Sequence, residues 1–144
     1  MRILAVDPGE KSLGIALSDP TGTIANPLTV LQHISRSLDA ASIATLAHEH
    51  GAGLIVVGQI LDEEGKPTPE SRRSARLAAA IRTQTRLPVE LWDESGSTQA
   101  ARQARIAMGA ARSKRGGHLD ELAATYILQT YLDAHFGGKE ATQA

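Results

Sequence analysis

Three acidic residues stand where predicted strands end or where a predicted helix begins. Asp7 follows the apolar run 3–6, Glu94 comes just after the strand-like run 89–92, and Asp120 lies in the first turn of the last predicted helix. If the three carboxylates converge, their mutual repulsion raises their pKa values unless a cation compensates the charge. Hard oxygen ligands of this kind suit Mg²⁺ or Mn²⁺. Two such ions, about 4 Å apart, can activate a water and stabilise the leaving oxygen, so the chemistry predicted is phosphodiester hydrolysis.

Each of these acids also has a purely structural explanation. Asp7 precedes a proline and a glycine, and aspartate is common in turns of that composition. Asp120 in a first helical turn stabilises the helix dipole, and Glu94, which has Asp93 beside it, could be a solvated loop acid. Only the joint placement of the three acids favours a metal site over these explanations.

Turn residues and apolar periodicity predict the elements that must position these acids. Leu13, Ile15 and Leu17 alternate with small residues as in a strand. Pro27 limits the third strand to an edge of the sheet or to a broken ladder. The predicted order is β-β-β-α-β-α-β-α-α, at residues 3–6, 13–18, 23–30, 37–50, 54–57, 71–86, 89–92, about 97–108 and from about 118.

This order predicts an α/β fold with a mixed five-stranded sheet flanked by helices, in which right-handed crossovers join the parallel strands. One architecture with this order is the ribonuclease H-like fold, whose first, fourth and fifth strands lie side by side and parallel. Asp7 and Glu94 would then emerge at the same edge of the sheet. Open α/β sheets bind their ligands at that edge.

Length and composition set the limits of the prediction. The 144 residues fit one compact domain at residues 1–136, with a flexible C-terminal tail at 137–144. The chain has no cysteine, which excludes disulfides and cysteine-ligated zinc or iron–sulfur sites. No apolar run approaches the roughly 18 residues that a membrane helix needs, so we expect a soluble, cytoplasmic protein.

The net charge of −1 hides a strong asymmetry along the chain. Residues 72–115 hold ten bases and three acids, net +7, while the rest holds five bases and thirteen acids, net −8. This asymmetry favours a nucleic-acid surface that contacts mainly phosphates, because aromatic residues are only 3%. A solvated helix face explains the helical arginines equally well. The candidate contacts, from a turn, a helix and a glycine-flanked segment, are Lys11, Arg72, Arg73, Arg76, Arg112, Lys114 and Arg115.

Four groups of residues follow one another along the chain: Asp7-Pro8-Gly9 with Lys11, Gly14 and 16–19; Val56-Val57-Gly58; 91–94 with Ser97-Thr98; and Asp120 with 122–124, 127–129 and 131–132. Together they resemble the YqgF/RuvX family over nearly the whole chain. Members of that family have a ribonuclease H-like fold and are described as candidate Holliday junction resolvases and as nucleases that mature the 5′ end of pre-16S ribosomal RNA. The resemblance implies a nuclease acting on structured RNA or branched DNA. It also implies that Asp7, Glu94 and Asp120 are the catalytic, metal-binding acids, with Mg²⁺ or Mn²⁺ as the cofactor.

The chain departs from the family pattern at Ser95, where members usually have an arginine. This departure keeps open a non-catalytic nucleic-acid-binding module. An ATP-binding phosphotransferase is a further rival, because Asp7-Pro8-Gly9 followed by Gly14 resembles the phosphate hairpin of sugar kinases. Those enzymes close two domains around the nucleotide, whereas this chain supplies one. A resolvase would be expected to form a homodimer that cuts two strands symmetrically.

Overall fold

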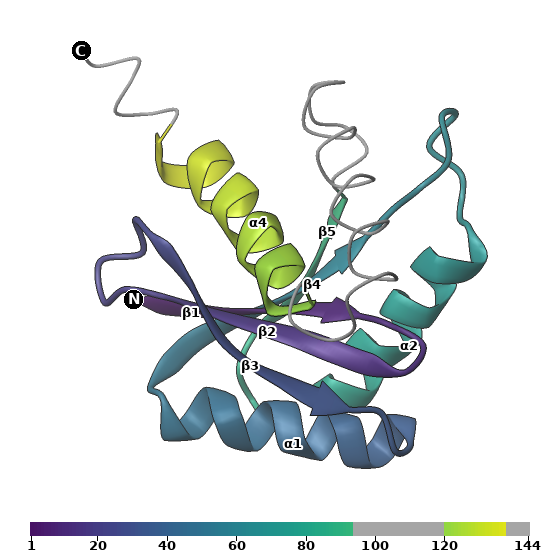
Figure 1. Cartoon of the computed structure of the whole chain (residues 1–144), viewed down its shortest axis with the longest axis horizontal. Helices are drawn as coiled ribbons and strands as arrows, with labels where there is room; N and C mark the ends of the chain where they lie inside the picture. The colour runs from purple at the N-terminus through teal and green to yellow at the C-terminus, as the bar shows by residue number, and fades with distance from the viewer. Residues whose placement is uncertain (94–119, 138–144) are drawn as a thin grey trace.

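The computed structural model describes residues 1–93 and 120–137 and contains one five-stranded sheet with helices on both faces (Figure 1). The elements, in chain order, are β1 (Arg2–Pro8), β2 (Ser12–Ser18), β3 (Ala25–Gln32), α1 (Arg36–Glu49), β4 (Ala52–Gln59), α2 (Pro69–Arg82), β5 (Val89–Asp93), α4 (Asp120–Leu132) and the π-helix η3 (Asp133–Gly137).

The sheet has the strand order β3-β2-β1-β4-β5. β1 pairs with β2, and β2 with β3, in antiparallel fashion, whereas β1, β4 and β5 are parallel to one another. This confirms the predicted mixed sheet with the first, fourth and fifth strands side by side. Pro27 lies on the edge strand β3 opposite Ala16, next to a register shift in the β2–β3 ladder, as its missing N–H requires.

The observed elements agree with the predicted ones to within a few residues. The predicted helix at 71–86 begins two residues earlier and ends at Arg82, and the predicted strand at 54–57 extends over Ala52–Gln59. The last helix begins, within the described residues, at Asp120. The predicted helix at about 97–108 and most of the predicted tail at 137–144 lie outside the described residues. Within residues 1–93 and 120–137, no helix is both long and apolar enough to cross a membrane.

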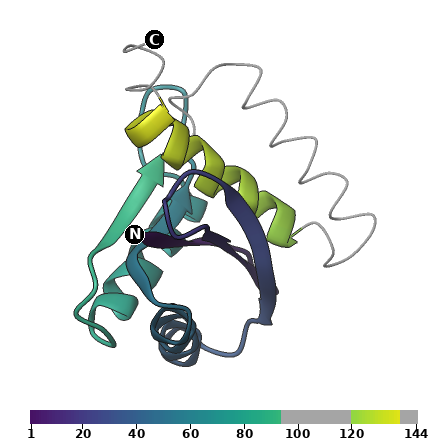
Figure 2. The same ribbon diagram turned by 90° about the vertical axis from the view of Figure 1, so that its left-hand side faces the viewer.

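Two separate apolar layers hold the helices on the sheet. Leu4 and Val6 of β1 belong to the layer under α1 and α2, while Ile3 and Ala5 belong to the layer under α4. Figure 2 shows α1 and α4 on opposite sides of the sheet. All four of these β1 side chains are fully buried, so β1 is covered on both faces, as expected for a central strand of a parallel sheet.

A pair of hydrogen bonds fixes the direction of α4 across the sheet. Near the end of this helix, the Gln129 side chain accepts from the backbone N–H of Ala25 at 3.0 Å and donates to the carbonyl of Thr23 at 3.2 Å. Thr23 lies in the β2–β3 turn, and Ala25 is the first residue of β3. This turn lies beside the start of β1, since the Met1 amino group donates to the Pro20 carbonyl. The last turns of α4 therefore lie at the start of β1, and its first turn lies toward the end of β1 (Figure 1).

The β2–β3 turn is itself organised by one carboxylate. Asp19 accepts hydrogen bonds from the backbone N–H groups of Thr23 and Ile24, at 2.7 and 2.8 Å, and from the side chain of Thr21. The Ile24 backbone hydrogen bond, followed by those from Thr21 and Thr23, lowers the pKa of Asp19 well below its usual value. Asp19 thus acts as an ionised acceptor that closes the turn to which α4 is tied.

We expect Gly58→Val to destabilise the fold by displacing α4. A Cβ at Gly58 would lie 2.6 Å from Ile127 Cδ1, and overpacking of this kind costs about 1–3 kcal/mol. Ile127→Ala alone should cost about 2–5 kcal/mol because this side chain is fully buried. In the double variant the vacated space admits the valine, so its free energy of unfolding in urea should fall by less than the sum of the two single effects. Strict additivity would show that the two residues do not compete for the same space.

We expect Asp19→Asn to lower the melting temperature in a pH-dependent way. The pKa of Asp19 is depressed in the folded state, so the stabilisation is present above the usual value of 3.8 and is lost as the pH falls toward the folded-state value. The melting temperatures of the native protein and the variant should therefore differ at pH 7 and converge below pH 3.8. Glu63→Gln, an exposed loop substitution, is the control. A difference in melting temperature that stays constant from pH 7 to below pH 3.8 would contradict the role of ionised Asp19 in the turn.

Candidate active site

Asp7 is the buried acid at the carboxyl end of the central strand. It is 2% exposed, the next-to-last residue of β1, and it pairs with Gly14 of β2. Side chains alternate along a strand, and the odd-numbered Ile3 and Ala5 belong to the layer under α4. Asp7 is therefore on the same face of the sheet as α4.

The parallel strands end together beside Asp7. Val6 pairs with Val57, and Gly58 pairs with Trp92, so Asp7 is level with the next-to-last residues of both β4 and β5. Adjacent strands are about 4.8 Å apart, which separates the ends of β1 and β5 by about 10 Å. β5 ends at Asp93, and Glu94 lies outside the described residues. Its predicted proximity to Asp7 stays a prediction.

Asp120 is the first residue of α4, and the helix presents its first turn toward the end of β1. The structure thus brings two of the three predicted acids, as chain positions, to one face and one end of the sheet (Figure 1). Within the described side chains, no group of three or more His, Asp or Glu residues is arranged to hold a metal ion. The side chains of Glu94 and Asp120 are not among the described side chains, so the cluster of three acids remains a prediction.

An aromatic pair fixes β5 against α4 next to this edge. The Trp92 indole N–H donates to Thr130 Oγ1 at 3.0 Å, and its ring meets the ring of Tyr131 edge-on at 5.4 Å. The Tyr131 hydroxyl donates to Glu90 Oε2 at 2.7 Å. Burial, followed by this hydrogen bond, raises the pKa of Tyr131 above its usual range, so the hydroxyl remains a donor. Trp92 also packs, partly buried, against the apolar layer under α4.

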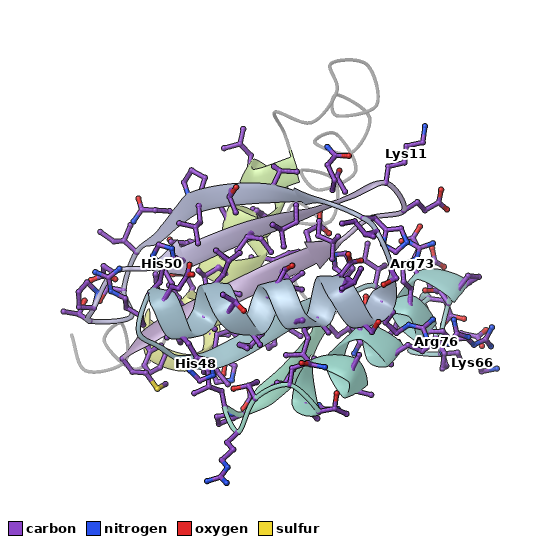
Figure 3. All side chains as sticks on the ribbon, turned by 90° about the horizontal axis from the view of Figure 1, so that it is seen from below. Lys11, His48, His50, Lys66, Arg73 and Arg76 are labelled. Atoms are coloured by element: carbon purple, nitrogen blue, oxygen red, sulfur yellow. The ribbon has the colours of Figure 1, made fainter. Side chains whose placement is uncertain are left out.

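The tight turn between β1 and β2 depends on glycine. Gly9 N–H donates to the Ser12 carbonyl at 3.0 Å, and a Cβ at Gly9 would collide with that same carbonyl oxygen. The turn leaves Lys11 exposed at its tip (Figure 3). Lys11 therefore lies at the same end of the sheet as Asp7.

The arginines of α2 lie at the same end of the molecule. A capping box starts this helix: Thr68 Oγ1 accepts from Ser71 N–H at 3.0 Å, and Ser71 Oγ accepts from Thr68 N–H at 2.8 Å. This start buries one face of α2 and leaves the arginines on the other. Arg72 and Arg76 are exposed, while Arg73 is half-buried and lies 3.3 Å from Glu10 of the β1–β2 turn.

Figure 3 gathers Lys11, Lys66, Arg73 and Arg76 at this end, whereas His48 and His50 lie at the opposite end of α1. The remaining predicted contacts, Arg112, Lys114 and Arg115, lie outside the described residues.

A cavity of about 450 Å³ lies on the other face of the sheet, under the β1–β2 turn and between the first turns of α1 and α2. Its lining includes His33, Arg36 and Asp39, none of which the sequence predicted as site residues. Asp39 is 5% exposed and accepts from Ile34 N–H at 3.1 Å, and its other oxygen is 2.5 Å from His33 Nδ1. The only sequence signal for this cavity was the helix N-cap at Ser35, which places Asp39 in the first turn of α1.

Comparison with known protein families shows to which family this chain belongs. A family profile described as "RuvX: Holliday junction resolvase" matches residues 1–134. The chain belongs to the RuvX family. Among its RuvX relatives, a protein of Myxococcus xanthus (strain DK1622) named "Putative pre-16S rRNA nuclease" is 36% identical over 135 residues, which cover 94% of this chain and 89% of the relative. A Clostridium beijerinckii protein of the same name is 36% identical over 133 residues, which cover 92% of this chain and 96% of that relative.

Solved structures confirm the ribonuclease H-like architecture of this RuvX chain. RuvC of Thermus thermophilus in complex with a Holliday junction substrate matches with a TM-score of 0.58 and 16% identity, over 95% of this chain and 96% of that one. The fowlpox virus Holliday junction resolvase matches with a TM-score of 0.51 and 15% identity, over 93% and 98%. At these identities the likeness concerns the fold.

Proposed function

We propose that the chain is a metal-dependent nuclease that hydrolyses phosphodiester bonds in structured nucleic acid. The observation that carries the proposal is the buried carboxylate of Asp7, at the carboxyl end of the central strand of a RuvX-family fold. Its carboxylate oxygens are hard ligands of the kind that divalent cations prefer. They lie at the end of the sheet where α/β folds bind ligands.

The donor set of this site fits Mg²⁺ or Mn²⁺. Asp7, Glu94 and Asp120 offer carboxylate oxygens only, and hard divalent cations prefer such ligands. Bound there, the ions would supply Lewis acidity at the phosphate and an activated water. Asp7 comes from a strand that is buried on both faces, so its carboxylate is held rigidly, which favours a fixed ligand geometry. Asp120 and Glu94 would complete the ligand set from the starting turn of α4 and from the end of β5.

The basic residues would position the substrate without reading its sequence. Lys11 lies at the tip of the turn that follows Asp7, and Arg72, Arg73 and Arg76 lie within the first eight residues of α2 at the same end of the molecule. Arginine and lysine contacts of this kind go to phosphates and fix the register of the nucleic acid. We include Arg112, Lys114 and Arg115 in the proposed surface, which favours recognition of substrate shape.

For the substrate, 5′-end processing of pre-16S ribosomal RNA is the first candidate, because curated relatives with 36% identity carry that name. Holliday junction resolution is the second candidate, because the description of the matching family states it. The two activities differ in their expected assembly. Symmetric cleavage of two strands requires two active sites, so a homodimer would favour the resolvase, and a monomer the RNA nuclease.

We expect Asp7→Asn to lower cleavage by about 10²-fold or more, as the loss of other preorganised charged groups in active sites does. The assay incubates the pure protein with pre-ribosomal RNA fragments, single strands and four-way junctions in Mg²⁺, Mn²⁺ or chelator. Chelation should abolish cleavage by the native protein. Glu63→Gln, which removes one exposed loop carboxylate, should cleave at the native rate, and circular dichroism should show that both variants are folded.

Two outcomes would contradict the proposal. Cleavage that survives both the chelator and Asp7→Asn would exclude a metal site built on Asp7. Binding of nucleic acid without cleavage in every condition would identify the non-catalytic module that the replacement of arginine by Ser95 keeps open.

A further inference from the structure

The cavity beneath the β1–β2 turn is separate from the carboxylate site. Pro8 is among its lining residues, and Pro8 follows Asp7 in the same strand, so the two side chains are on opposite faces of the sheet. Part of the cavity wall is apolar and fixed, because Leu13 and Leu77 are 2% and 4% exposed and belong to the layer under α1 and α2. A ligand could occupy this cavity without touching Asp7.

The rim of the cavity is rich in arginine. Arg36 comes from the first turn of α1, and Arg73 and Arg76 come from α2, one turn apart, so three arginines from two helices line one cavity. Among the described residues, the side chains of Arg36 and Arg76 form no hydrogen bond or ion pair. Arg73 has one partner, Glu10, whose side chain is 79% exposed. An exposed pair of this kind is weak, so Arg73 can exchange Glu10 for a stronger acceptor at little cost.

The acid in the cavity does not neutralise these arginines. Both oxygens of Asp39 are already engaged, one by the backbone N–H of Ile34 and the other by His33. The arginines and carboxylates of the lining, Arg36, Arg73 and Arg76 against Glu10 and Asp39, sum to a net charge of +1, three positive minus two negative. The cavity therefore attracts an anion, and the planar arginine side chains favour an oxyanion that can accept two parallel hydrogen bonds.

The size of the cavity indicates more than a simple anion. A volume of about 450 Å³ lies within the range typical of small-molecule sites and greatly exceeds the space that a phosphate ion fills. Apolar walls from Leu13, Leu77 and Pro69 stand beside the arginine rim. This combination suits a ligand with a charged phosphate at one end and a flat, weakly polar group at the other.

We propose that this cavity binds a nucleoside phosphate, whose phosphate is held by Arg36, Arg73 and Arg76 and whose base packs on the apolar walls. The nucleotide can be free in solution or can be the phosphorylated end of a nucleic-acid strand. The site uses neither Asp7 nor a metal ion, so the proposal goes beyond nuclease activity. It shares Arg73 and Arg76 with the proposed substrate surface, and only Arg36 belongs to the cavity alone.

The test measures binding of AMP, adenosine and inorganic phosphate to the full chain by calorimetry in the presence of chelator. We expect AMP to bind more tightly than either of the other two. Arg36→Gln and Arg76→Gln should each weaken AMP binding about tenfold, since each removes a charge-assisted hydrogen bond. Both arginines are exposed, so neither variant is expected to unfold the protein. The matched control is Arg86→Gln, which removes one exposed arginine beyond the other end of α2.

Competition distinguishes the two sources of the nucleotide. A short oligonucleotide with a terminal phosphate that displaces AMP better than its hydroxyl-ended counterpart would assign the site to a strand end. Displacement by neither oligonucleotide would assign it to a free nucleotide. The proposal is overturned if AMP binds no better than adenosine, if phosphate alone binds as tightly as AMP, or if Arg86→Gln weakens binding as much as Arg36→Gln and Arg76→Gln do. The nuclease proposal is tested separately, by Asp7→Asn and chelation, so loss of AMP binding and loss of metal-dependent cleavage are distinguishable.

Discussion

Burial of β1 on both faces is the constraint on which the rest of the structure depends. A central strand covered from both sides must send successive side chains into two different layers, and its register is fixed by both layers at once. At the carboxyl end of β1 this alternation sends Asp7 toward α4 and Pro8 toward α1 and α2. One dipeptide thus separates an acidic site on one face from an arginine-rimmed cavity on the other, and a shift of one residue would exchange them.

The helix that covers the acidic face is held at three places. Gln129 ties its far end to the β2–β3 turn and to the first residue of β3, and Ile127 packs directly on Gly58, where no side chain keeps the helix away from the sheet. Trp92 and Tyr131 then join β5 to the same helix. The elements that would supply the three acids are therefore parts of one packed unit. Rigid support of this kind is what a metal site needs when its ligands come from distant parts of the sequence.

Much of the fold could be predicted from the sequence, because the apolar periods are strong and the turn residues are distinctive. Pro27 predicted an edge strand, and β3 is one. Asp7 was predicted at the end of a strand and lies there, but its closeness to Glu94 depends on residues after Asp93 that the structure does not describe. The arginine-rimmed cavity was missed for a physical reason. It forms only when two helix starts and a turn pack together, and Arg36 lies outside the base-rich stretch on which the charge argument concentrated.

The position of Trp92 has a practical consequence for study of this protein. It is the single tryptophan of the chain, it lies level with Asp7 at the sheet edge, and its indole is tied to α4. Its fluorescence therefore comes from one known place, between the last strand and the covering helix. The chain carries its own optical probe beside the acidic site, so separation of that helix from the sheet can be followed without any attached dye.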